Sequence, residues 1–93
     1  MIITVSQAIY CNSTEDINNY FPIKKSYEST IVPRIGESLY NYMWNEKVES
    51  KIADVLYDMD KQSCDIMLEK RVTELSKEDV AKLANLHGWE TTI

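Results

Sequence analysis

Hydrophobic and polar residues alternate at the start of the chain. Ile3, Val5 and Ile9 fall on one face of an extended segment and polar residues fall on the other, which predicts a strand over residues 2–10. The last clear pattern is helical: Val80, Leu83 and Ala84 recur at the spacing of one helix face. Strands first and a helix last indicate an α+β protein.

The segment after the first strand has weaker signals. Ser13 is expected to cap a short helix over residues 14–20, which Pro22 ends. Residues 23–30 are polar and include two lysines, so we expect a connection across the sheet or a ragged edge strand.

The middle of the chain predicts an antiparallel meander. Three short apolar runs, residues 38–44, 51–57 and 63–68, are separated by turn-like residues at 45–49 and 58–62. The third run alternates most cleanly. The second does not alternate, so it is either covered on both faces or shifted in register by a bulge.

Particular residues refine this meander. Gly36 suits a turn or bulge that requires a positive φ, and the register shift is expected near Asp54. If the strand over residues 38–44 is regular, Tyr40, Tyr42 and Trp44 share one face.

The C-terminal helix has signals at both ends. Ser76 is its expected N-cap, and Gly88 follows its last turn as in a Schellman ending. Trp89 is then expected to fold back onto Leu83 or Ala84 and become buried.

Composition limits the class of protein. The chain has 93 residues, which we take as a single domain over residues 1–93, and 44% of them are hydrophobic. A net charge of −5 argues against a nucleic-acid binder and suits a partner with a basic surface. No apolar run is long enough to cross a membrane, and the first residues do not resemble a signal peptide, so we expect a cytoplasmic protein.

Candidate catalytic groups have structural explanations. Cys11 and Cys64 are expected to be reduced and buried, and His87 lies where the last helical turn favours a cation. The spacing of these residues fits no metal site, and we expect no cofactor and no enzyme activity. Four acids surround the 58–62 turn, and we expect them to accept hydrogen bonds from the backbone of the turn. A metal-dependent hydrolase that uses these acids is the third choice of function. The four acids are Asp54, Asp58, Asp60 and Asp65.

Aromatic residues are the main candidates for binding, because Tyr and Trp combine apolar area with a polar group. The candidate site comprises Tyr40, Tyr42, Trp44 and Tyr57, with Lys47 and Glu49 as a polar rim. The helix stripe is narrow and covers one face of the sheet, so we expect part of this group in an intermolecular contact, most simply a two-fold homodimer. Alternatively, the four aromatics line a pocket for a nucleotide-like small molecule.

Three segments resemble a known type of small protein. Residues 32–37 read VPRIGE, residues 55–58 read VLYD and residues 64–68 read CDIML. Together they resemble the small SH3-like barrels found in short phage and mobile-element proteins. The resemblance implies a compact barrel or a strongly bent sheet that serves as a binding module, of the kind with which phages inhibit host enzymes and defence systems.

The expected fold is therefore a bent antiparallel sheet or small SH3-like barrel of four to five strands with a C-terminal helix. The expected function is non-enzymatic protein binding, in the narrower form a phage-type inhibitor of a host defence factor. Sequestration of a small molecule is the alternative.

Overall fold

The computed structural model of the protein describes residues 1–44 and 48–91. The seven strands and the α-helix are β1 (Ile2–Tyr10), β2 (Tyr20–Glu28), β3 (Ser38–Asn41), β4 (Val48–Asp58), β5 (Ser63–Leu68), β6 (Arg71–Val72), α1 (Lys77–Leu86) and β7 (Glu90–Thr91). Two 3₁₀ turns, η1 (Ile17–Asn19) and η2 (Tyr42–Trp44), complete the elements.

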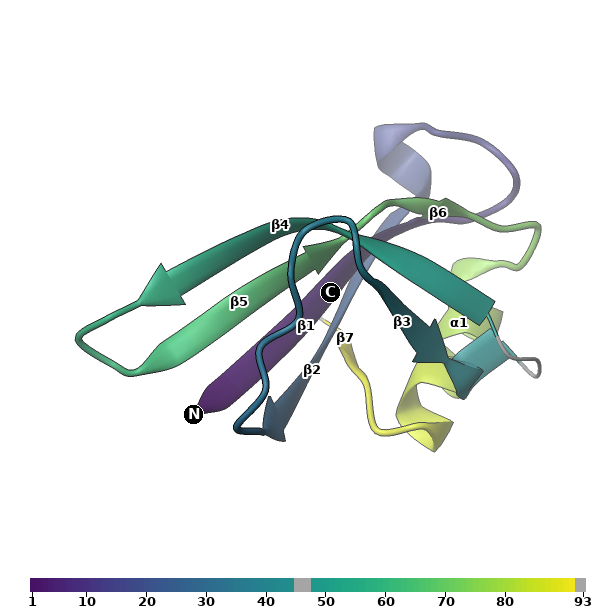
Figure 1. Ribbon diagram of the computed structural model, residues 1–93. Coiled ribbons are helices and arrows are strands. Elements are labelled where there is room, and N and C mark those ends of the chain that lie inside the picture. The colour runs from purple at the N-terminus through teal and green to yellow at the C-terminus, as the bar shows by residue number, and fades with distance from the viewer. Residues whose placement is uncertain (45–47, 92–93) are drawn as a thin grey trace.

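The strands form one sheet in the order β3-β4-β5-β1-β2-β7, and β6 also pairs with β1 (Figure 1). β1 pairs antiparallel with β2 over its whole length, from Ile2 opposite Glu28 to Tyr10 opposite Tyr20. On its other side β1 runs parallel to β5 and then to β6. β1 is therefore the central strand of the molecule.

The predicted α+β class is confirmed at this level, since a sheet is followed by a C-terminal helix. The sheet is mainly antiparallel, as expected, but it is mixed, because β1 pairs in parallel with β5 and β6. The sheet is not closed into a barrel: β3 and β7 end the strand order and do not pair with each other. The strand count also exceeds the four to five expected, since β2 and two short strands join the meander.

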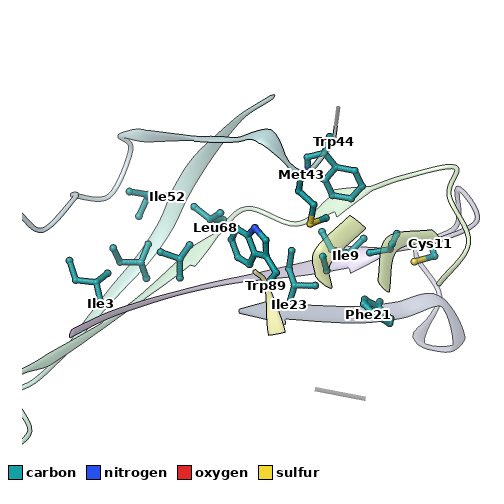
Figure 2. Close-up of a cluster of buried hydrophobic side chains, with 14 of the residues drawn as sticks. Ile3, Ile9, Cys11, Phe21, Ile23, Met43, Trp44, Ile52, Leu68 and Trp89 are labelled. Atoms are coloured by element: carbon teal, nitrogen blue, oxygen red, sulfur yellow. The ribbon is translucent and has the colours of Figure 1, made fainter. Parts of the chain in front are cut away.

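The core lies on one face of the sheet. β1 contributes Ile3, Val5 and Ile9, and these predicted inward residues are all buried. Figure 2 shows Met43 and Trp44 reaching the same cluster from η2, with the indole of Trp89 in its middle. Residues from both ends of the chain therefore share one core.

The short helix expected over residues 14–20 is wrong. Ser13 has a left-handed backbone with φ of 58°, and Asp16 instead caps the single turn η1. β2 begins at Tyr20 and passes through Pro22. β2 forms despite its polar composition because it pairs with β1 along nine residues, and strand formation depends on neighbours more than on intrinsic preference.

The predicted meander is confirmed. β3 pairs antiparallel with the first residues of β4, and the rest of β4 pairs antiparallel with β5. The register of β4 shifts between Ile52 and Asp54, at the position predicted for a bulge. Gly36 has a φ of 87° in the turn that precedes β3, where the Glu37 amide donates to the Arg34 carbonyl at 3.0 Å.

The strand through Tyr40, Tyr42 and Trp44 is not regular, which corrects the expectation that the three share a face. β3 ends at Asn41, and the 3₁₀ turn η2 redirects the chain. Trp44 is consequently buried, whereas Tyr40 is 56% exposed. The side chain of Tyr42 lies outside the described residues.

The predicted ends of α1 are confirmed. The Ser76 hydroxyl accepts from the amide of Asp79 at 3.2 Å. Gly88 has a φ of 78°, and the Trp89 amide donates to the Ala84 carbonyl at 2.8 Å, which is the long-range bond of a Schellman ending. Trp89 is 7% exposed, as expected from this geometry.

Candidate functional site

An open cavity of about 380 Å³ lies on the core side of the sheet, and we call it the apolar pocket. Its floor consists of core residues from three parts of the chain: Ile3 and Val5 of β1, Ile66 and Leu68 of β5, and Trp89. Alternation places these β1 and β5 side chains on the same face, because Ile3 pairs with Cys64 and Val5 with Ile66 in register.

The segment that joins β2 to β3, residues 29–37, crosses the sheet (Figure 1). It also lines one side of the pocket. It contributes Ile31 and Pro33, and β3 adds Leu39 and Tyr40. The segment is held at both ends, since the Ser29 amide donates to the Met1 carbonyl at 3.0 Å and the Gly36 amide donates to the Ile52 carbonyl at 3.0 Å. Backbone hydrogen bonds therefore hold in place the segment that forms this side of the pocket.

The rim of the pocket is aromatic and acidic. Tyr27 and Tyr40 are each about half exposed, and Ile31 is 75% exposed. Glu28 is the only charged residue among the described residues that line the pocket. The nearby Lys25 ammonium lies 5.3 Å from the Tyr27 ring centre and donates to the His87 carbonyl at 2.8 Å. The pocket therefore offers an apolar lining with one acidic residue and one ammonium group near its rim.

The structure separates the residues predicted to form one aromatic site. Tyr40 lines the apolar pocket, but Trp44 lies in the core with the Arg71 guanidinium 4.3 Å from its ring centre. Tyr57 is 52% exposed near the end of the β4–β5 hairpin. Glu49 is exposed on β4, and Lys47 lies outside the described residues.

Several pocket residues were not among the predicted site residues. Ile31, Pro33 and Leu39 precede or begin β3, and Tyr27 lies in the segment expected to be a connection. A usable signal in the sequence was the number of apolar residues in this connection, which carries Ile31, Val32, Pro33 and Ile35 among nine residues.

The cysteines and the hairpin acids lie outside the lining of the apolar pocket. The Cys11 and Cys64 thiols are unbonded and buried, and burial raises the pKa of each, so neither is a ready nucleophile. Asp58 accepts from the amides of Asp60 and Lys61 at 3.1 Å, which is the turn chemistry expected for the hairpin acids. Within residues 1–44 and 48–91, no three His, Cys, Asp or Glu side chains are placed to hold a metal ion.

No helix in the described part of the chain is both long and apolar enough to cross a membrane. Comparison with known proteins gives no match: no family model fits the chain, and no curated protein or solved structure is significantly similar to it. The functional argument therefore rests on the geometry of the pocket and its rim.

Proposed function

We propose that the protein is a non-enzymatic, cytoplasmic binding module that captures a partner protein through the apolar pocket. The observation that supports this is the pocket itself: its floor is core, its rim carries half-exposed Tyr27 and Tyr40, and Ile31 is exposed beside them. Apolar pockets with aromatic rims are typical anchoring points for a partner's side chain.

The charge of the rim defines the partner further. Glu28 lies beside an otherwise uncharged lining, and the chain as a whole carries a net charge of −5. A partner segment with an apolar anchor next to Lys or Arg complements both features. The narrower proposal, a phage-type inhibitor of a host defence factor, rests on the sequence resemblance of residues 32–37, 55–58 and 64–68 alone, since the sheet is not closed into a barrel.

A matched pair of variants tests the proposal. Ile31 and Leu86 are 75% and 76% exposed, but only Ile31 lines the pocket. Immobilised wild type, Ile31→Ser and Leu86→Ser would be compared for the proteins that they retain from host extract. We expect Ile31→Ser to lose the retained protein and Leu86→Ser to keep it, with both variants melting close to wild type. Equal retention by both variants contradicts the proposal.

A small apolar molecule is the second candidate for the same pocket, and its volume favours this. The cavity of about 380 Å³ falls in the range of ~300–1,000 Å³ typical of small-molecule sites. A nucleotide-like ligand has less support, since no Lys or Arg is among the described lining residues to pair with a phosphate. Native mass spectrometry of the purified protein distinguishes a retained protein from a retained ligand.

Self-association through Tyr40 remains part of the proposal. Tyr40 is half exposed at the pocket rim, so a second copy could cover it in a two-fold dimer. Light scattering at micromolar concentration tests this, because a dimer has twice the monomer mass of 10.8 kDa. A monomeric result removes the dimer but leaves partner capture intact.

A further inference from the structure

The outer edge of β2 is paired along only part of its length. β7 pairs with β2 opposite Ile23 and Lys24, and no other strand of the described chain pairs with this edge. The residues near the end of β2, Ser26, Tyr27 and Glu28, are exposed. Tyr27 and Glu28 also line the apolar pocket. β2 therefore has a short free edge directly beside that pocket.

The register of β2 shows which backbone groups face this edge. The Ser29 amide donates to the Met1 carbonyl at 3.0 Å, in line with the pairing of β1 and β2. Backbone groups alternate in direction along an antiparallel strand, so the odd-numbered residues of β2 bond to β1. The N–H and C=O groups of Ser26 and Glu28 therefore point to the free edge. Pro22 belongs to the same even-numbered series, where its missing N–H costs no bond to β1.

This part of the edge lacks the usual protection. Edge strands are normally protected by proline, lysine, a bulge or a covering segment. The first half of β2 has Pro22 and the pairing with β7, whereas residues 26–28 continue the regular register with β1 and carry no such device. Within the described residues, the outward backbone groups of Ser26 and Glu28 have no hydrogen-bond partner. An extended chain supplies the donors and acceptors that such an edge lacks.

We propose that the partner of the apolar pocket binds as an extended strand that adds antiparallel to residues 26–28 of β2. This inference rests on the proposed function, because it specifies how a partner segment reaches the pocket. The partner residues opposite Ser26 and Glu28 bond to the free backbone groups. The partner residue opposite Tyr27 points to the same face of the sheet as Tyr27, which is the face of the pocket. Strand addition therefore places one apolar side chain of the partner in the pocket.

The same register defines the residue that precedes this apolar side chain. Glu28 pairs with Ile2 and is exposed, so its side chain lies on the outer face of the sheet. Lys25 points to the other face, and Lys24 pairs with Glu90 at 3.9 Å. Within the described residues, the Glu28 carboxylate has no ion-pair partner. Opposite charges on directly paired residues stabilise a sheet, so the partner should carry Lys or Arg opposite Glu28.

A second copy of β2 is the competing occupant of the edge. A two-fold pairing centred on Tyr27 would place that residue opposite its own copy and Glu28 opposite Ser26. It would satisfy the backbone groups but leave both carboxylates without a cation. An extended segment with a basic residue directly before an apolar one satisfies the backbone, the pocket and the charge together, and we therefore favour it.

Selection from a library of random linear peptides against the immobilised protein tests the proposal. We expect the selected peptides to share a Lys or Arg directly before an apolar residue. Ser26→Pro removes an edge-facing N–H without removing a bond to β1, so it should weaken the binding of a selected peptide about tenfold or more. Ser26→Ala is the matched control. It removes the hydroxyl that lies 3.0 Å from the Thr4 hydroxyl but keeps the backbone N–H, so it should bind like wild type.

N-methylation of a selected peptide repeats the test without changing the protein. Methyl groups on alternate peptide amides should abolish binding in one series and be tolerated in the other, because only alternate residues of an added strand bond to β2. This pattern decides the matter if Ser26→Pro does not fold. Unchanged binding to folded Ser26→Pro, or equal losses in the two methylated series, overturns strand addition.

The outcomes separate this proposal from the proposed function. If Ile31→Ser loses the peptides and Ser26→Pro keeps them, the apolar pocket is the binding site but the partner is not an added strand. A selection that yields no peptide overturns strand addition, whereas capture of a folded partner is tested independently with host extract. A dimer that Ser26→Pro dissociates would assign the edge to a second copy and overturn the proposal.

Discussion

Trp89 has two structural roles at the residue scale. Its amide closes the end of α1, and its ring forms part of both the core and the floor of the apolar pocket. We expect Trp89→Ala to lower the free energy of unfolding by about 3–5 kcal/mol, the range for deleting a large buried aromatic side chain. Urea denaturation measures this. Trp89→Phe should cost clearly less, and a cost below about 1 kcal/mol for the alanine variant would show that the ring is dispensable to the core.

Gly36 isolates the effect of backbone conformation. Its φ is 87°, and no atom lies within 4 Å of the position that a Cβ would occupy, so a substitution meets strain without a clash. We expect Gly36→Val to cost about 1–2 kcal/mol and Gly36→Asn less, since Asn tolerates positive φ better than β-branched residues do. Thermal melts of the two variants compare them. Equal losses would mean that the turn does not hold this φ in solution.

The two thiols predict a dependence of stability on pH. Burial raises the pKa of Cys11 and Cys64 above the ordinary value of 9.0, because the folded protein favours the neutral thiol. A raised pKa means that this stability is fully present below the unfolded-state pKa and is lost as pH rises through the folded-state value. We expect the urea midpoint to fall between about pH 8 and pH 10, with a shallower fall in Cys11→Ala/Cys64→Ala. Parallel slopes in the two proteins would contradict this.

Residue-scale predictions from the sequence succeeded where the cause is local. The positive φ of Gly36, the Ser76 cap and the burial of Trp89 follow from the geometry of a turn and of helix ends. The burial of Gln7 and of Trp44 could not be predicted this way. Their environments depend on β4, β6 and η2, which are brought to β1 by pairings between distant parts of the chain.

Elements were predictable in proportion to their periodicity. β1, β5 and α1 have clear patterns and appear where expected. β2 has no such pattern and is nonetheless a nine-residue strand, because its backbone completes the antiparallel edge of β1. The expected helix over residues 14–20 failed for a local reason: Ser13 has a positive φ, and Asp16 caps only the single turn η1 before β2 begins at Tyr20.

β4 provides a test at the scale of an element. β3 pairs with residues 48–51, so within the described chain the later part of β4 pairs only with β5 and has a free edge. The Asp54 carboxylate accepts from the Val55 amide at 2.9 Å on this stretch, and a bulge precedes it. A charge, a bulge and a locally satisfied amide are devices that keep edge strands from pairing with other chains.

We therefore expect Asp54→Val to aggregate, because it removes the carboxylate and creates a run of apolar residues on an exposed edge. Light scattering during incubation at micromolar concentration measures this. Asp65→Val is the control, since it removes the same charge from β5, which lies between β4 and β1 in the sheet. If both variants aggregate alike, the cause is the loss of charge and not the exposed edge of β4.

The arrangement of the whole molecule was the least accessible to prediction. The meander β3-β4-β5 was predictable because its strands are close in sequence. The parallel pairing of β1 with β5 joins segments about sixty residues apart, from Ile2 with Ser63 to Ser6 with Met67. That pairing sets the floor of the apolar pocket, so the pocket could not be predicted from local patterns even though Ile3, Val5 and Trp89 were expected to be buried.

Two properties of the whole molecule should act separately on partner binding. The net charge of −5 and Glu28 at the pocket rim act at long range, so they should raise the association rate with a basic partner. Under the proposed function, the apolar pocket acts only after contact, so burial of a partner's side chain there should set the dissociation rate. The two effects are separable by measuring binding kinetics at low and high salt with a partner identified by capture.

We expect higher salt and Glu28→Gln to slow association with little change in dissociation, because salt screens exposed charges beyond ~10 Å. Ile31→Ser should instead speed dissociation about tenfold, the effect of losing roughly 1.4 kcal/mol of apolar contact. Leu86→Ser again serves as the control, since Leu86 is equally exposed but lies outside the pocket. If Ile31→Ser alters association alone, the partner is attracted to this surface without inserting a side chain, and the pocket is not its anchoring point.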